Sequence, residues 1–223
     1  MAIMEEDVGC NTIEYWNGIW KKWRHDDKPS YIAAQANNTC NGAYWNDAFK
    51  NPRKNIKYSV QRAWWYAKRM NVSSILDVGC GNGRLLHGMQ YIVPSAYLFG
   101  IDFSDVGIER MKKEYGIPGS TMDVYELYKL NRTFDMVIVN DVLEHVKDEE
   151  RFLKGCVDVL SDDGFLYLGI PNDILGPEDT AEHLRKYTEE SVRELLGKFF
   201  DEVIIEIIDI HIICKAKTKK TIS

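Results

Sequence analysis

The feature that most constrains this chain is a run of three glycines at alternate positions, directly after an aliphatic stretch. Residues Ile75–Val78 predict a short buried strand, and the amphipathic run that begins at Arg84 predicts a helix. Between them, Gly79, Gly81 and Gly83 predict a tight turn, because glycine tolerates positive φ and lets another molecule approach the backbone closely. A strand, a glycine turn and a helix N-terminus can gather inward-pointing backbone N–H groups at the carboxyl edge of a sheet.

Size and composition limit the alternatives. The 223 residues suit one α/β domain with an extension, and a net charge of −6 argues against a large nucleic-acid footprint. Five cysteines without a C-x-x-C pair favour a reducing compartment over a disulfide framework, and they lack the ligand spacing of a structural zinc site, so no metal is expected. The sequence shows no signal peptide and no apolar stretch long enough to span a membrane. We therefore expect a cytoplasmic location.

Residues 1–70 are expected to form a helical, aromatic-rich extension that contains all six tryptophans. Residues 13–23 carry Ile13, Trp16, Trp20 and Trp23 at helical spacing, which predicts one aromatic helix face. This face either packs on the core, covers a cofactor as a lid, or lies on a membrane surface. Residues 25–43 predict a loop, and residues 56–70 a second helix.

From Ser73 onward, predicted strands and helices alternate, which is typical of a parallel sheet with crossover helices. The predicted strands are 75–78, 97–102, a short strand at 121–122, 134–139, 164–170, 203–208 and 211–217, and the predicted helices are 84–91, 106–115, 149–160 and 189–198. The last two strands are expected to pair as an antiparallel hairpin. Their connection, residues 209–210, lacks glycine, which favours a longer loop.

The spacing of the glycines separates two ligand classes. A dinucleotide fingerprint reads G-x-G-x-x-G, whereas this turn reads G-x-G-x-G, with Arg84 where the third glycine would stand. With Asp77 two positions ahead, the pattern Asp-x-Gly-x-Gly-x-Gly resembles the first motif of class I S-adenosylmethionine-dependent methyltransferases. The alternative is a tight turn that binds no ligand.

The resemblance implies a Rossmann-like α/β fold for residues 71–223, with a mostly parallel seven-stranded sheet whose last strand is antiparallel. It implies S-adenosylmethionine as the cofactor and S-adenosylhomocysteine as the product. In this family the turn passes beside the amino-acid part of the cofactor, so the residues implied there are Asp77, Gly79, Cys80, Gly81, Asn82 and Gly83.

Asp102 ends the second predicted strand, where an acid can accept hydrogen bonds from ribose hydroxyls. A lone aspartate is more often a helix cap, and Ser104 or Asp105 could equally cap the next helix. Asp123, after the third strand, resembles the acid that meets the adenine amino group in these methyltransferases, and the alternative is a surface turn. Met122 and Val124 would flank the adenine ring and Phe103 would cover it, although the family more often has glycine in place of Met122.

The run Asn140–Val146 follows the fourth strand and resembles the fourth motif of small-molecule methyltransferases, especially of the ubiquinone-biosynthesis type. Asn140 and Asp141 would lie under the sulfonium end of the cofactor, where the methyl group meets its acceptor, and Asp141 is a candidate catalytic residue. If the acceptor is a hydroxyl, a base must take its proton, and histidine is the usual candidate. The candidates are His145 and His183, each with a structural alternative as a packing or capping residue. His25, His87 and His211 have no supporting context.

The sequence carries neither an Asn-Pro-Pro-Tyr signature of nucleic-acid methylation, nor a Pro-Cys nucleophile, nor a paired-glutamate loop. The first hypothesis is therefore methyl transfer to an oxygen or nitrogen of a small metabolite. The alternatives are methylation of RNA or protein, and a non-catalytic binding subunit. A nucleotide-cofactor oxidoreductase is less compatible with the motifs. The acceptor and the oligomeric state stay open.

Overall fold

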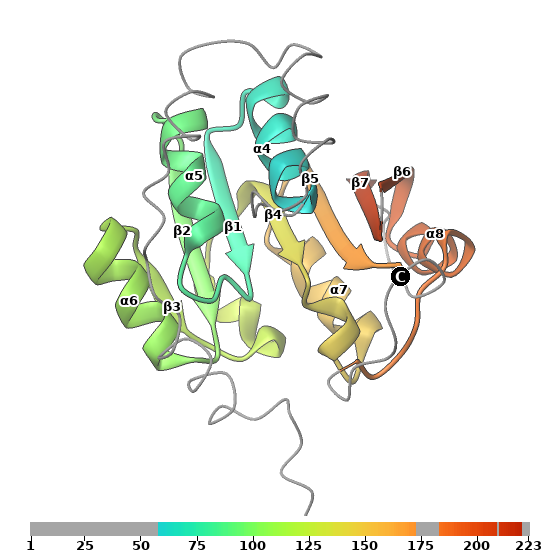
Figure 1. Ribbon diagram of the computed structural model, residues 1–223. Helices are drawn as coiled ribbons and strands as arrows, with labels where there is room; N and C mark the ends of the chain where they lie inside the picture. The colour runs from blue at the N-terminus through green and yellow to red at the C-terminus, as the bar shows by residue number, and fades with distance from the viewer. Residues whose placement is uncertain (1–57, 173–182, 209, 220–223) are drawn as a thin grey trace, which may run out of the picture.

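The computed structural model describes residues 58–172, 183–208 and 210–219 (Figure 1). The predicted helix over residues 13–23 and the loop over 25–43 lie outside them. Among the described residues, no helix combines the length and apolarity needed to cross a membrane. The elements are α4 (Tyr58–Met70), β1 (Ser74–Val78), α5 (Arg84–Ile92), β2 (Tyr97–Asp102), α6 (Asp105–Tyr115), β3 (Gly119–Thr121), η2 (Val124–Leu130), β4 (Phe134–Asn140), η3 (Leu143–His145), α7 (Glu149–Asp158), β5 (Leu160–Pro171), α8 (Glu189–Gly197), β6 (Phe200–Ile208) and β7 (His211–Lys219).

Seven strands form one sheet in the order β3-β2-β1-β4-β5-β7-β6, with β3 and β6 at its two edges (Figure 1). Every pairing from β3 to β5 is parallel, and β7 runs antiparallel to both β5 and β6. The predicted fold class, a mostly parallel seven-stranded Rossmann-like sheet with an antiparallel last strand, is confirmed.

Alternating strand residues bury the two faces of the sheet in separate cores. On one face, Leu76, Val137 and Leu166 pack with residues of α7 and α8. On the other face, Ile75 and Met136 pack with residues of α4, α5 and α6. Because helices cover both faces, the central strands are apolar on both sides, as parallel sheets require.

Helix α4 is part of the second core. Trp64 is 3% exposed, and its indole Nε1 donates to the Leu85 carbonyl at 3.0 Å. The Tyr167 hydroxyl on β5 donates to the carbonyl of Ser59. The division of the chain into residues 1–70 and 71–223 stays a prediction, but the helix that ends the first part packs on the sheet of the second.

Two local expectations differ from the structure. Ile208 pairs with His211, so only two residues connect β6 and β7, and the longer loop predicted there is wrong. The pairing of Ile208 with His211 leaves no room for a longer connection. Strand β3 ends at Thr121, so Met122 follows the strand instead of lying on it.

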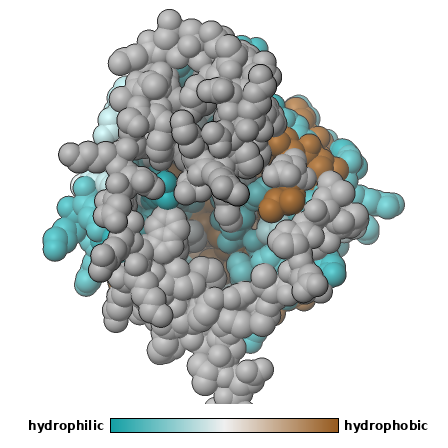
Figure 2. Space-filling view, in the orientation of Figure 1, coloured by the Kyte–Doolittle hydropathy of each residue, from teal (hydrophilic) through white to brown (hydrophobic). Residues whose placement is uncertain are grey.

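Hydropathy of the described surface is mostly low, with apolar atoms gathered on the side where β6 closes the sheet (Figure 2). Ile204 and Ile207 of β6 are 47% and 44% exposed.

Candidate active site

The candidate site lies at the carboxyl edge of the sheet, where β1 and β4 are neighbours. After β1 the chain builds β2 and β3 on one side, and it then returns to build β4 and β5 on the other side. Such a reversal opens a crevice outside the strand ends, and ligands of open α/β sheets bind there. The glycine turn and the run that starts at Asn140 both leave the sheet at this crevice.

The three glycines of the turn all have positive φ, at 76° for Gly79, 54° for Gly81 and 77° for Gly83. Their N–H groups are used within the protein. Gly79 and Cys80 donate to the Ile101 carbonyl, Gly81 donates to the Asp102 carboxylate, and Gly83 donates to the Cys80 carbonyl. The prediction that these N–H groups point into a pocket is therefore wrong for these four residues. Their N–H groups donate to other groups of the protein, mostly to the end of β2. Because its glycines have no side chains, the turn lets a ligand come close to its backbone. It does not present these N–H groups to a phosphate, as a phosphate-binding loop would.

Close packing explains why side chains are missing from this turn. A Cβ at Gly79 would lie 2.4 Å from Val142 Cγ2, and a Cβ at Gly83 would lie 2.3 Å from Met111 Cγ. The Cys80 thiol is buried in the core, and a Cβ built on Gly100 would lie 2.7 Å from its Sγ. Cys80 can therefore face a ligand only with its backbone. The Asn82 side chain is 1% exposed, and its Nδ2 finds no hydrogen-bond partner among the described residues.

Two buried carboxyl groups stand beside the turn. Asp77 is 3% exposed, and burial together with the nearby charge of Asp102 raises the pKa of Asp77 to about 8. Burial also raises the pKa of Asp102, while hydrogen bonds from the N–H groups of Ser104 and Gly81 oppose this rise. Two acids in one apolar pocket favour a cationic ligand, because a positive charge compensates both desolvation and their mutual repulsion.

Asp102 has the geometry expected of a ribose-binding acid. Its Oδ1 accepts from Ser104 N and its Oδ2 from Gly81 N, each at 2.8 Å, which fixes the carboxylate at the mouth of the crevice. Each carboxylate oxygen can accept a second hydrogen bond. The helix-capping role that Asp102 could have had belongs to Ser104, whose Oγ accepts from Gly107 N.

The predicted adenine-binding residues follow β2 and β3. Met122 N donates to the Asp102 carbonyl at 2.9 Å, so the ends of the two strands are tied together. The side chains of Met122 and Val124 are half-buried against the core, and Phe103 is half-buried as well. Asp123 is exposed and caps η2, with its Oδ1 accepting from Tyr125 N at 2.9 Å. These positions are compatible with the predicted roles, which stay predictions.

Asp141 leaves β4 in an unusual conformation. Its φ is 55°, one of three positive values among the described non-glycine residues, and its N–H donates to the Gly169 carbonyl at 2.8 Å. The Asn140 amide Nδ2 donates to Asp141 Oδ2 at 2.8 Å. The other carboxylate oxygen, Oδ1, lies 4.0 Å from Nε2 of His211, the first residue of β7. Sequence reasoning found no context for His211, although an antiparallel last strand begins at the edge where parallel strands end.

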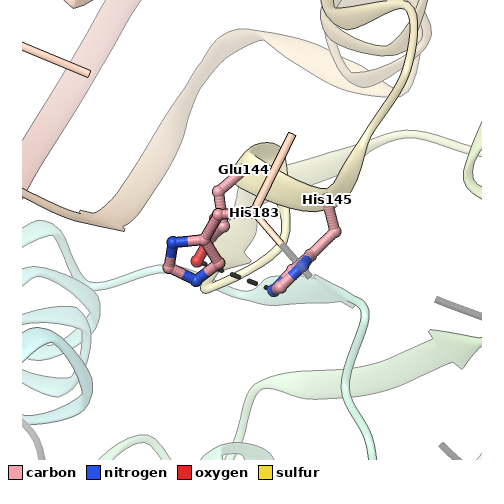
Figure 3. Close-up of side chains that lie close together, drawn as sticks. All are labelled: Glu144, His145 and His183. Atoms are coloured by element: carbon pink, nitrogen blue, oxygen red, sulfur yellow. Dashed lines mark ion pairs between the residues drawn. The ribbon is translucent and has the colours of Figure 1, made fainter. Parts of the chain in front are cut away.

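Glu144, His145 and His183 lie together, as Figure 3 shows. Glu144 is buried, its Oε1 lies 3.9 Å from His145 Nε2, and the two imidazole centroids are 5.2 Å apart. One nitrogen or oxygen of each residue lies within 4.8 Å of the others. Two imidazoles and a carboxylate form a donor set suited to a divalent cation. Cysteine spacing, the only metal pattern considered in the sequence, could not reveal this set.

His183 is held in place by the segment that follows it. Leu184 N donates to the Glu144 carbonyl at 2.8 Å, and the Arg185 guanidinium donates to the carbonyls of Val146 and Lys147. The Tyr187 hydroxyl donates to Glu149 at 2.8 Å. These contacts fasten the segment 183–187 to the loop after β4 and bring together the two histidines predicted as candidate bases.

Residues 76–168 match a family model described as a methyltransferase domain. Residues 76–168 therefore form a methyltransferase domain, and the relatives and the fold support the class I S-adenosylmethionine-dependent type. Among curated relatives, the mitochondrial ubiquinone biosynthesis O-methyltransferase of Bos taurus is 34% identical over 110 residues, which are 45% of this chain and 29% of the relative. The ubiquinone biosynthesis O-methyltransferase of Coxiella burnetii is 29% identical over 141 residues, which are 58% of this chain and 57% of the relative. The chain thus spans less than two thirds of the length of these relatives.

Solved methyltransferase structures share the fold. The plantazolicin methyltransferase BpumL, in complex with S-adenosylhomocysteine and a triazolic desmethylPZN analog, has a TM-score of 0.61 at 15% identity, over 92% of this chain and 97% of that chain. The N-methyltransferase NodS of Bradyrhizobium japonicum, in complex with S-adenosylhomocysteine, has a TM-score of 0.58 at 16% identity, over 84% and 96% of the two chains. At these identities the likeness concerns the fold.

Proposed function

We propose that this methyltransferase domain transfers the methyl group of S-adenosylmethionine to an oxygen or nitrogen of a small metabolite. The observation that carries the proposal is the glycine turn at the β1/β4 crevice, whose donors are used internally and whose neighbours are two buried acids. This environment suits a cationic ligand with a ribose better than a pyrophosphate. The names of the curated relatives favour oxygen as the acceptor atom.

In this proposal, different residues contact different parts of the cofactor. Asp77 and the glycine turn face the amino-acid part, and Asp102 accepts hydrogen bonds from the ribose hydroxyls. Asp123 meets the adenine amino group, and Phe103, Met122 and Val124 enclose the ring. Asn140 and Asp141 then lie beside the sulfonium.

The methyl transfer itself needs little acid–base catalysis. The acceptor attacks the methyl carbon in line with the carbon–sulfur bond, a new bond to carbon forms, and the sulfur keeps the electron pair of the broken bond. Holding the two reactants in this alignment supplies most of the rate enhancement. For a hydroxyl acceptor, the proton passes to a nearby base, for which the imidazoles of His145 and His183 and the carboxylate of Asp141 are the candidates.

The cluster of Glu144, His145 and His183 favours a second form of the same reaction, in which these residues hold a divalent cation. Such an ion lowers the pKa of a coordinated hydroxyl and thereby does the work of a base. The two forms differ in one measurement. Chelation with EDTA, followed by addition of Mg²⁺, Mn²⁺ or Zn²⁺, abolishes and restores turnover only if the histidines serve as ligands.

The proposal is tested first by cofactor binding. Isothermal titration of the protein with S-adenosylhomocysteine is expected to show one site, and Asp102→Asn is expected to weaken it about tenfold or more, as the loss of hydrogen bonds to a charged group implies. Asp105→Asn, an exposed acid in the first turn of α6, is the matched control and should bind normally. Binding of NADH in place of S-adenosylhomocysteine would point to the oxidoreductase alternative and sink the proposal.

The acceptor class is tested next. Panels of phenols, catechols and primary amines are incubated with S-adenosylmethionine, and release of S-adenosylhomocysteine is measured. Turnover of at least one small acceptor is expected. Cofactor binding without turnover of any of them, combined with turnover of RNA or protein, would replace the small metabolite by a macromolecule.

A further inference from the structure

His211 is a buried polar residue, and the burial of its imidazole must be compensated by polar neighbours. It is 5% exposed and begins β7, between its strand partners Pro171 of β5 and Ile208 of β6. Polar groups are rarely buried without compensation. A charged group lies close to it, the Asp141 carboxylate, whose Oδ1 is 4.0 Å from the imidazole Nε2.

Asp141 is restrained on every side that the structure describes. Its backbone has a positive φ and is bonded to Gly169, and Asn140 donates to its Oδ2. His211 faces its Oδ1, so both carboxylate oxygens have a polar neighbour. A non-glycine residue in this backbone region is uncommon, and such strain persists where the surrounding structure imposes it, often at functional sites.

We propose that His211 is a positioning residue that aims the carboxylate of Asp141 at the methyl acceptor. The proposal rests on the proposed methyl transfer. Asp141 stands at the β1/β4 crevice, next to Val142, which packs against Gly79 of the glycine turn. From there the carboxylate accepts a hydrogen bond from the O–H or N–H of the acceptor and thereby orients its lone pair towards the methyl carbon.

For a hydroxyl acceptor the bonds balance. The oxygen–carbon bond forms, the carbon–sulfur bond breaks with its electrons going to sulfur, and the O–H proton moves to Asp141 and from there to solvent. His211 lies beside the carboxylate, with its Nε2 4.0 Å from Oδ1, and need not touch the acceptor. This role explains why a strand outside the predicted motifs supplies a buried histidine to the crevice.

The test compares His211→Leu with His211→Gln, which keeps an N–H donor at a similar position. With catechol as the acceptor probe, His211→Leu is expected to lower kcat about 10- to 100-fold, the usual effect of losing a group that orients a catalytic residue. The KM for S-adenosylmethionine and the affinity for S-adenosylhomocysteine should change less than about twofold. His211→Gln should regain most of the activity, and Asp141→Asn should lose about 100-fold or more.

His87 offers a matched control, since this histidine is stacked on Tyr115 and bonded to Gln90 on α5. His87→Leu should leave kcat unchanged. A kcat for His211→Leu within twofold of the wild type would overturn the proposal. An equal loss in His211→Gln, accompanied by a lower melting temperature, would show that His211 is merely structural.

A second measurement, by NMR spectroscopy, tests the pairing of His211 with Asp141 without any methyl acceptor. In protein labelled with ¹⁵N-histidine, Asp141→Asn should shift the Nε2 resonance of His211 and leave that of His87 in place. If S-adenosylhomocysteine does not bind, the proposed function fails whatever this spectrum shows. If it binds and the His211 resonance does not respond to Asp141→Asn, the pairing fails by itself.

Discussion

Gly79 shows how one backbone position can connect two halves of a site. It directly follows β1, and its missing side chain makes room for Val142, which lies after β4. Asp77 and Asp102 add a second link, because two acids share one buried pocket beside the turn. Substitutions at these positions therefore affect both folding and ligand binding, and matched controls can separate the two effects.

We predict that Gly79→Ala weakens both stability and cofactor affinity. Its φ of 76° disfavours alanine, and the new Cβ would lie 2.4 Å from Val142 Cγ2. The free energy of unfolding should fall by about 1–3 kcal/mol. Gly116→Ala is the control, because its φ is also positive, at 67°, but nothing lies within 4 Å of the added Cβ. Urea unfolding and titration with S-adenosylhomocysteine check the pair, and equal results for the two variants would refute the steric argument.

We predict that Asp77 makes the unliganded protein less stable as the pH rises. Its pKa is about 8 in the folded protein, compared with 3.8 for an aspartate in water. Between these two values, the unfolded chain has released the proton while the folded protein still binds it, so raising the pH favours unfolding. Asp77→Asn lacks this proton. Its melting temperature should therefore exceed that of the wild type by a margin that grows from about pH 4 to about pH 8, and a margin independent of pH would contradict the prediction.

At the level of the secondary-structure elements, most residues of the candidate site lie on the loops that connect the strands and helices. The segment 183–187 precedes α8, yet it is bonded to the loop that links β4 to α7. Arg185 is central because its guanidinium donates to two carbonyls and lies 3.4 Å from Glu149. This attachment decides where His183 stands relative to Glu144 and His145.

We predict that Arg185→Gln loosens this attachment without unfolding the domain. Losing charge-assisted hydrogen bonds worth about 1.5–3 kcal/mol each should make the Leu184 amide, which is bonded to the Glu144 carbonyl, exchange about tenfold faster or more. Arg193→Gln removes an exposed pair with Glu189 on α8 and should leave that amide unchanged. Hydrogen exchange followed by mass spectrometry measures both, and equal protection in the two variants would show that Arg185 does not hold the segment.

The local elements were predictable because their signals are local. The aliphatic run before Gly79, the amphipathic run from Arg84 and the alternation of strands and helices each depend on neighbouring residues. The place of His211 depends instead on the register of β7 against β5, which residues far apart in the chain decide. The two-residue connection between β6 and β7 was missed for a different reason, because residues 209–210 lack the glycine that favours a tight turn.

At the scale of the whole molecule, α4 connects the N-terminal part of the described chain to the sheet. Its residues Ala63 and Ala67 are fully buried, and Trp64 fills the space above Gly88 of α5. Trp64 and Tyr66 of this helix thus pack in the core. Trp16, Trp20, Trp23 and Trp45 lie outside the described residues, so their roles stay predictions.

We predict different costs for the two adjacent tryptophans of α4. Trp64→Ala should lower the free energy of unfolding by about 3–5 kcal/mol, the usual cost of emptying a buried aromatic site. Trp65 is half-buried, with the Arg62 guanidinium 4.2 Å from its ring, and Trp65→Ala should cost less than half as much. Urea unfolding measures both variants. Equal costs would mean that α4 does not contribute to the core as described.

The antiparallel direction of β7 has a consequence for biosynthesis. The ribosome makes the glycine turn early, but the strand that carries His211 is the last of the sheet to be made. A nascent chain that has already folded β1 to β5 would present the crevice without the histidine that faces Asp141. In such a chain, the proposed cofactor site at the glycine turn would exist before His211 takes its place beside Asp141. A ligand that binds the glycine turn would then bind this folding intermediate before the enzyme is complete.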